Sequence, residues 1–146
     1  MSVEATQRNA TRNQSTVDFE RKNMFLFGNR YQEAVFLNNT GAEETFTAGS
    51  LVLRDIATAG QIKPAIAGVT LADVIGILAV DGTVVLADAG TTQCNYCIKG
   101  DIDASLLQLP ATVTLDTVVG NKTLKDILTD LGFVLFNVTE NSKTDN

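Results

Sequence analysis

Two cysteines and two aspartates stand at spacings that can support chemistry. Cys94 and Cys97 have the Cys-x-x-Cys spacing of redox dithiols, and Asp101 and Asp103 are separated by one residue. A redox pair needs a helix N-terminus to stabilise its thiolate, whereas this pair lies in an alternating run, residues 94–99, that predicts a strand. Side chains three apart on a strand point to opposite faces. The pattern therefore favours two packed, free thiols.

The aspartate pair has an enzymatic and a structural interpretation. Paired carboxylates can hold a divalent cation or carry out acid–base catalysis, so a small metal-dependent hydrolase is one hypothesis. The stretch from Asp103 through Ser105 to Leu106 and Leu107 also fits a helix cap that opens a short turn, and this interpretation is favoured.

Other catalytic signatures are missing from the sequence. The chain has no His and only the two cysteines, so a zinc site would lack two ligands. It contains no Gly-x-Ser-x-Gly elbow, P-loop or dinucleotide fingerprint. We therefore expect no catalytic residues, no metal, no cofactor and no enzymatic activity.

Composition predicts one globular domain among the 146 residues, because 45% of them are hydrophobic and 19% are charged. The net charge of −6 argues against general binding to nucleic acid or anionic lipid. No apolar run approaches the ~20 residues that span a bilayer, and the first residues are polar, so we expect a soluble product that is not exported. Five of the eleven basic residues fall in the first thirty: Arg8, Arg12, Arg21, Lys22 and Arg30.

Alternating and turn-bounded apolar runs predict a mostly β fold. Strands are expected at residues 31–37, 44–47, 51–55, 61–66, 74–80, 83–86, 94–99 and 133–138. Residues 44–47 should return against 31–37 through the turn at 38–41, and Pro64 should place its strand at a sheet edge. Gly76 indicates a bulge or a close backbone approach. This spacing predicts a small antiparallel sandwich or barrel.

One short helix is predicted near the C-terminus, at residues 123–132. Its apolar residues recur at i, i+3, i+4 and i+7, which forms a single stripe; they are Leu124, Ile127, Leu128 and Leu131. Thr123 with Asp126 resembles a capping pair, and Gly132 suits a left-handed stop.

The domain organisation follows from where apolar residues are dense. Residues 1–18 hold few apolar side chains and are predicted to form a flexible N-terminal arm, residues 19–140 a β-rich domain, and residues 141–146 a polar tail. Aromatic residues are dense between 19 and 36, where they serve either as a core edge or as anchors in another protein.

Several of these segments together resemble a known family. They are residues 48–53 (AGSLVL), 74–80 (VIGILAV), 96–100 (YCIKG), the Leu109-Pro110 exit, and the helix followed by 132–135 (GFVL). In order and spacing they resemble the lambda-like head decoration, or capsid cement, proteins of tailed bacteriophages. The resemblance covers residues 46–138 and implies a β-tulip-like domain that trimerises. The Trp associated with the exit in that family is Gln108 in this chain.

The resemblance also implies a function. Such a protein, made in the host cytoplasm, binds the outer surface of the virion capsid as a homotrimer and stabilises contacts between major capsid protein subunits. Capsid-binding arm residues are then expected at Val17, Phe19, Arg21, Phe25 and Phe27, and trimer contacts at Asp101, Asp103, Leu106 and Leu107. The alternative is a phage surface or tail module that binds a glycan or a host factor.

Overall fold

The computed structural model describes residues 24–66 and 68–137, with side chains at 68 and 69 left out. Within them the chain is mostly β with one α-helix, as the sequence predicts. The strands are β1 Phe25–Leu37, β2 Glu44–Thr47, β3 Leu51–Arg54, β4 Gln61–Pro64, β5 Val74–Leu78, β6 Thr83–Leu86, β7 Thr91–Asp103, β8 Val118–Val119, β9 Lys122–Thr123 and β10 Phe133–Phe136. The helical segments are the 3₁₀ turns η1 Gly68–Asp73 and η2 Ala104–Leu106 and the α-helix α2 Leu124–Leu131.

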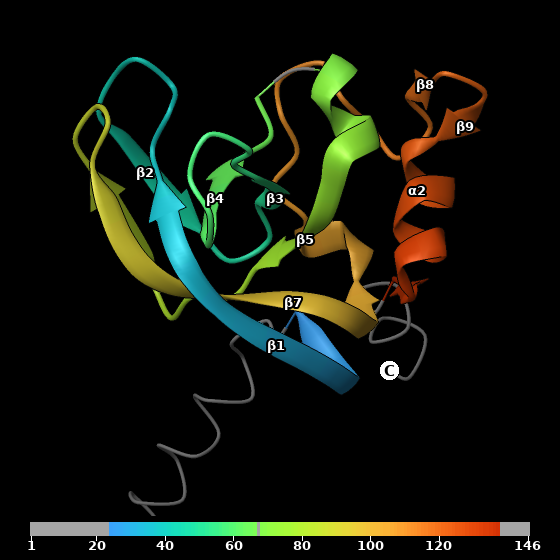
Figure 1. Cartoon of the computed structure of the whole chain (residues 1–146). Coiled ribbons are helices and arrows are strands. Elements are labelled where there is room, and N and C mark those ends of the chain that lie inside the picture. Colours follow the sequence, from blue (N-terminus) through green and yellow to red (C-terminus); the bar gives the residue numbers. More distant parts are fainter. Residues whose placement is uncertain (1–23, 67, 138–146) are drawn as a thin grey trace, which may run out of the picture.

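Five strands close into a barrel, and a sixth extends it (Figure 1). The order is β1-β4-β3-β5-β7, and pairing of β7 with β1 closes the ring. Three of the neighbouring pairs and the closing pair are antiparallel, whereas β1 pairs with β4 in parallel. Strand β10 adds to β7 in parallel beyond the ring. The predicted barrel is therefore confirmed, with two parallel pairings that the sequence did not indicate.

The predicted hairpin between the first two strands is wrong. Strand β2 pairs with β6, and β1 pairs instead with β7 and β4. The reason lies at Asn38, which is fully buried. Its Nδ2 donates to the carbonyl oxygens of Ala42, Leu86 and Ala87 at 2.8, 2.9 and 3.1 Å. These bonds hold residues 38–42 against the end of β6, so the chain enters β2 beside β6 rather than beside β1.

The prediction of an edge strand at Pro64 is also wrong, because β4 lies between β1 and β3. The Ala65 N–H donates to the Leu51 carbonyl at 2.9 Å, so Pro64 and Val52 form a non-hydrogen-bonded pair in the alternating antiparallel pattern. The proline nitrogen thus faces the β1 side, where pairing with β4 covers only residues 61 and 62. The missing N–H therefore removes no ladder bond.

Gly76 shows both features that the sequence predicts for it. The register between β3 and β5 shifts at this point, with Val52 opposite Gly76 and Leu53 opposite Val74. A Cβ atom at Gly76 would lie 2.4 Å from the carbonyl oxygen of Cys97 on β7. The glycine therefore lets β5 and β7 approach each other closely beside the bulge.

Two apolar clusters form the core, one on each face of the barrel wall. The first receives a side chain from each barrel strand, namely Phe36, Ile62, Val52, Leu78 and Tyr96, and so fills the barrel. The second lies outside the wall, between strands β3, β5 and β7 and the covering elements η1, α2 and β10 (Figure 1). Its covering residues include Leu71, Leu124, Leu128 and Phe133.

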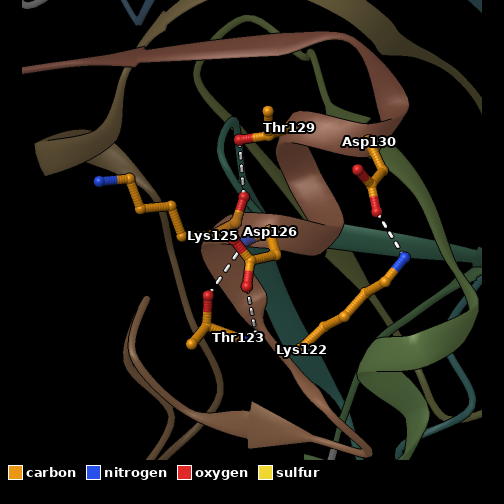
Figure 2. Close-up of polar contacts among 6 residues, drawn as sticks. All are labelled: Lys122, Thr123, Lys125, Asp126, Thr129 and Asp130. Carbon is orange, nitrogen blue, oxygen red and sulfur yellow. Dashed lines mark hydrogen bonds and ion pairs between the residues drawn. The ribbon is translucent and has the colours of Figure 1, made fainter.

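The predicted helix forms with both of its predicted ends. The Asp126 N–H donates to Thr123 Oγ1 at 3.2 Å and the Thr123 N–H donates to Asp126 Oδ2 at 3.1 Å, which completes a capping box (Figure 2). Gly132 ends the helix in the left-handed region, with φ of 111°. Leu124 and Leu128 are fully buried, so the apolar stripe fixes α2 on the outer cluster.

Candidate functional site

An apolar strip crosses three neighbouring strands at one end of the sheet. We define it as Phe27 on β1 and Val134 and Phe136 on β10, with Asp101 of β7 between them. Phe27 and Val134 are both register partners of Asp101, and Phe136 is the partner of Asp103. The apolar side chains are 77%, 50% and 41% exposed. The strip therefore holds three exposed apolar side chains at one end of the sheet, with the partly exposed Asp101 between Phe27 and Val134.

A bulge in β1 brings Phe27 to this face. Phe25 is opposite Ile102 and Phe27 is opposite Asp101, so two steps on β1 match one step on β7. This extra residue reverses the alternation. Phe25 consequently packs against the outer core cluster with Ile102, and Phe27 points to the other side. Gly28, with φ of 68°, and further register shifts follow. These irregularities break the alternating pattern of the sequence, so the predicted strand begins at residue 31 although β1 begins six residues earlier.

Tyr31 is a second exposed aromatic residue of β1, on the side of Phe25 rather than of Phe27. Its ring packs edge-on against Phe25 with centroids 5.7 Å apart, yet half of the residue is exposed. Partial burial, and secondarily the nearby Cys97 thiol, raise the pKa of its phenol. The phenol therefore stays protonated at neutral pH and remains available as a hydrogen-bond donor.

The residues predicted for trimer contact divide between surface and core. Asp103 is buried and caps η2, because its Oδ1 accepts from the Ser105 N–H at 3.1 Å and from the Ser105 hydroxyl at 2.6 Å. Leu106 and Leu107 are partly buried and pack against the outer core cluster. Asp101 is partly exposed within the strip. The capping interpretation is thus confirmed for Asp103.

The residues predicted for the arm are only partly described. Val17, Phe19 and Arg21 lie outside the described residues, as do the predicted arm, 1–18, and tail, 141–146. Phe25 and Phe27 belong to β1, within the barrel sheet. The structure therefore makes Phe27 and Asp101, which the sequence assigned to different contacts, neighbours on one surface.

The two cysteines are free and buried, as predicted. Cys94 belongs to the cluster inside the barrel and Cys97 to the cluster outside it, so the two thiols lie on opposite faces of β7. Burial raises the pKa of both thiols, and hydrogen bonds that Cys97 makes with the Asn29 amide and with the backbone only partly oppose this rise at Cys97. Neither thiol has the lowered pKa of a redox nucleophile.

Neither a metal centre nor a membrane-spanning helix is present in the part of the chain that the structure describes. Residues 24–66 and 68–137 contain no group of three or more His, Cys, Asp or Glu side chains placed to share a metal ion. No helix among them is long and apolar enough to cross a bilayer.

Sequence reasoning missed the contribution of β10 to the strip. The signal was the tetrapeptide Phe133-Val134-Leu135-Phe136, which is apolar on both faces of a strand at the end of the domain. Phe133 and Leu135 use one face in the core, and the core does not account for the apolar side chains of Val134 and Phe136 on the other face.

Comparison of the sequence with protein-family models and with curated proteins finds no match.

Proposed function

We propose that the protein is a non-enzymatic capsid decoration protein of a tailed bacteriophage, which binds the outside of the mature head and stabilises contacts between major capsid protein subunits. The observation that carries the proposal is the apolar strip. Exposed apolar groups gathered on adjacent strands are typical of protein contact surfaces. Phe27 lies three residues after Met24, where the segment that precedes the described residues joins the barrel.

Charge next to the strip favours an acidic partner. Arg30 on β1 is the register partner of Lys99 on β7. In the β1–β7 register this pair comes directly after the pair of Phe27 and Asp101. Like charges directly opposite each other on neighbouring strands repel. A carboxylate on the capsid protein would offset this repulsion, while the strip supplies apolar contact.

An open strand edge provides a second mode of contact. On the side away from β7, β1 pairs with β4 only at Val35 and Phe36, so residues 25–34 have no strand neighbour there among the described residues. An extended segment of another protein can pair with the regular part of this edge, residues 31–34 beyond the bulges, through backbone hydrogen bonds. Three copies bound together would add avidity; this homotrimer is part of the proposal and rests on the family resemblance.

The test is co-sedimentation with expanded, undecorated heads of the phage that encodes the chain. The full chain should bind and pellet with the heads, and a chain beginning at residue 19 should bind more weakly because it lacks the predicted arm. Equal affinity of the two chains removes the arm from the mechanism, and failure of the full chain to pellet refutes the proposal. Light scattering of the free protein tests the trimer independently.

A further inference from the structure

A groove crosses the outer face of the first half of β7, where the outer core cluster no longer covers the sheet. Its volume is about 920 Å³. Gln93 and Asn95 form part of its lining and are exposed. They alternate with Cys94 and Tyr96, which belong to the cluster inside the barrel. The side chains of Gln93 and Asn95 place the groove on the outside of the barrel wall, and it borders the inner cluster at Cys94 and Val80.

The chemistry of the groove changes along its length. Met24, Phe25, Tyr31 and Leu106 make one part apolar. The other part is polar and includes Asp81, Gln93 and Asn95. The register separates the two parts, because the Asp103 N–H donates to the Met24 carbonyl at 2.8 Å near the end of β7, whereas Gln93 and Asn95 lie near its beginning. Asp81 is the one charged side chain in the lining.

We propose that this groove binds residues 12–23 of the same chain in the free protein. Residue 23 precedes Met24, which lines the apolar part of the groove and is itself buried, so the segment must start from that part. An extended chain spans ~3.3 Å per residue, which puts Phe19 within about 17 Å and Arg12 within about 40 Å of Met24. A short connection of this kind gives an effective concentration on the order of millimolar.

Beyond residues 20–23, the segment carries apolar, then polar, then basic residues that suit the groove. Counting back from Met24, the polar and charged residues 20–23 form a short connection, after which Phe19 and Val17 follow two residues apart, so that in an extended segment both side chains would lie on one face. They suit the ring of Tyr31 and the other apolar groups. Next come Asn13, Gln14, Ser15 and Thr16, whose amides and hydroxyls match Gln93 and Asn95. Arg12 then carries the charge complementary to Asp81.

This inference does not depend on the proposed function, but its regulatory consequence does. A decoration protein whose arm occupies its own groove must release that arm before the arm can bind a capsid. The groove would then compete with the shell for the arm. Binding to the head would be delayed until the lattice offers a better site than the groove.

The test places a nitroxide on the segment and observes the groove by NMR. A Ser15→Cys chain is labelled with the nitroxide; Cys94 and Cys97, at 5% and 0% exposure, stay unlabelled. The amide signals of Gln93 and Asn95 should lose intensity through paramagnetic broadening. A label on Val118→Cys, on β8, is the matched control and should leave these signals intact. Adding Asp81→Lys to Ser15→Cys should restore part of the lost intensity.

Three outcomes would overturn the proposal. Intact signals would show that the segment is not in the groove. In a mixing experiment, chains that carry the nitroxide but no ¹⁵N are added to unlabelled ¹⁵N chains. Broadening seen only in that mixture would show that the groove binds the segment of a second copy. The groove is lined by the ring of Tyr31 together with amides and a carboxylate, which would also suit a carbohydrate. Shifts of the Gln93 and Asn95 signals on addition of glycans, without broadening by the label at residue 15, would show that a carbohydrate binds instead.

Addition of heads distinguishes the groove proposal from the proposed function. If the broadening persists when the protein is bound to heads, the arm does not bind the capsid, and the groove proposal still stands.

Discussion

Truncation of Phe27 tests the apolar strip directly. A docked aromatic side chain buries on the order of 200 Å², and 77% of Phe27 is exposed in the free protein, so about 150 Å² is available for contact. Alanine would retain roughly a third of this area. The loss of about 100 Å² at ~25 cal/mol/Å² corresponds to about 2.5 kcal/mol of binding free energy. Phe27→Ala should therefore weaken binding to heads roughly 50- to 100-fold.

The assay compares binding isotherms on expanded heads with chemical unfolding of the same variants. Because Phe27 is mostly exposed, its truncation should change the free energy of unfolding by no more than about 0.5 kcal/mol. Ile56→Ala is the matched control, since Ile56 is 93% exposed on the loop after β3 and is not in the strip. Binding by Phe27→Ala within about twofold of the wild type, at unchanged stability, would refute the role of the strip.

Three further predictions concern the fold. Gly76→Ala should lower the free energy of unfolding by about 1–3 kcal/mol and speed amide exchange at Leu78, because its Cβ meets the Cys97 carbonyl. Ile56→Ala, which truncates a side chain that is 93% exposed, should leave that exchange rate unchanged. The capping box lowers the pKa of Asp126 in the folded protein. The stabilisation from this carboxylate is therefore present above the pKa of the unfolded chain and is lost as the pH falls through the pKa of the folded protein. Asp126→Asn should flatten the decline of stability in acid, and an unaltered decline would argue against this role of the carboxylate. Cys94 and Cys97 should react with a thiol reagent at mild alkaline pH only as fast as the protein unfolds, and rapid labelling of the native protein would contradict their burial.

The elements could be predicted from the sequence because local patterns specify them. The capping pair at Thr123, the stop at Gly132 and the turn-bounded strands depend on neighbours within a few residues. The cap at Asp103 is also local, since its partner is Ser105. These features follow from intrinsic preferences that tertiary packing did not override.

Strand pairing could not be predicted from the same patterns. Asn38 belongs to a sequence that is typical of a hairpin turn, yet its amide bonds carbonyls of residues 86 and 87, nearly fifty positions away. The strip depends on pairing in the same way. Phe27 faces solvent because of a bulge, and Val134 lies level with it only because β10 pairs in parallel with β7. Such contacts arise from tertiary packing, which local periodicity does not encode.

The closure of the barrel by β1 and β7 also determines when the protein can fold. The hydrogen bond from the Tyr96 hydroxyl to Gln32 joins residues 64 positions apart, and the first barrel strand must wait for the last. Non-local pairing of this kind slows folding because a long loop must close before the contacts form. On the ribosome, β1 would emerge early and stay without its β7 partner until residue 103 has been made. The bulges and Gly28 that shape β1 in the native sheet would also hinder its pairing with other nascent chains during that wait.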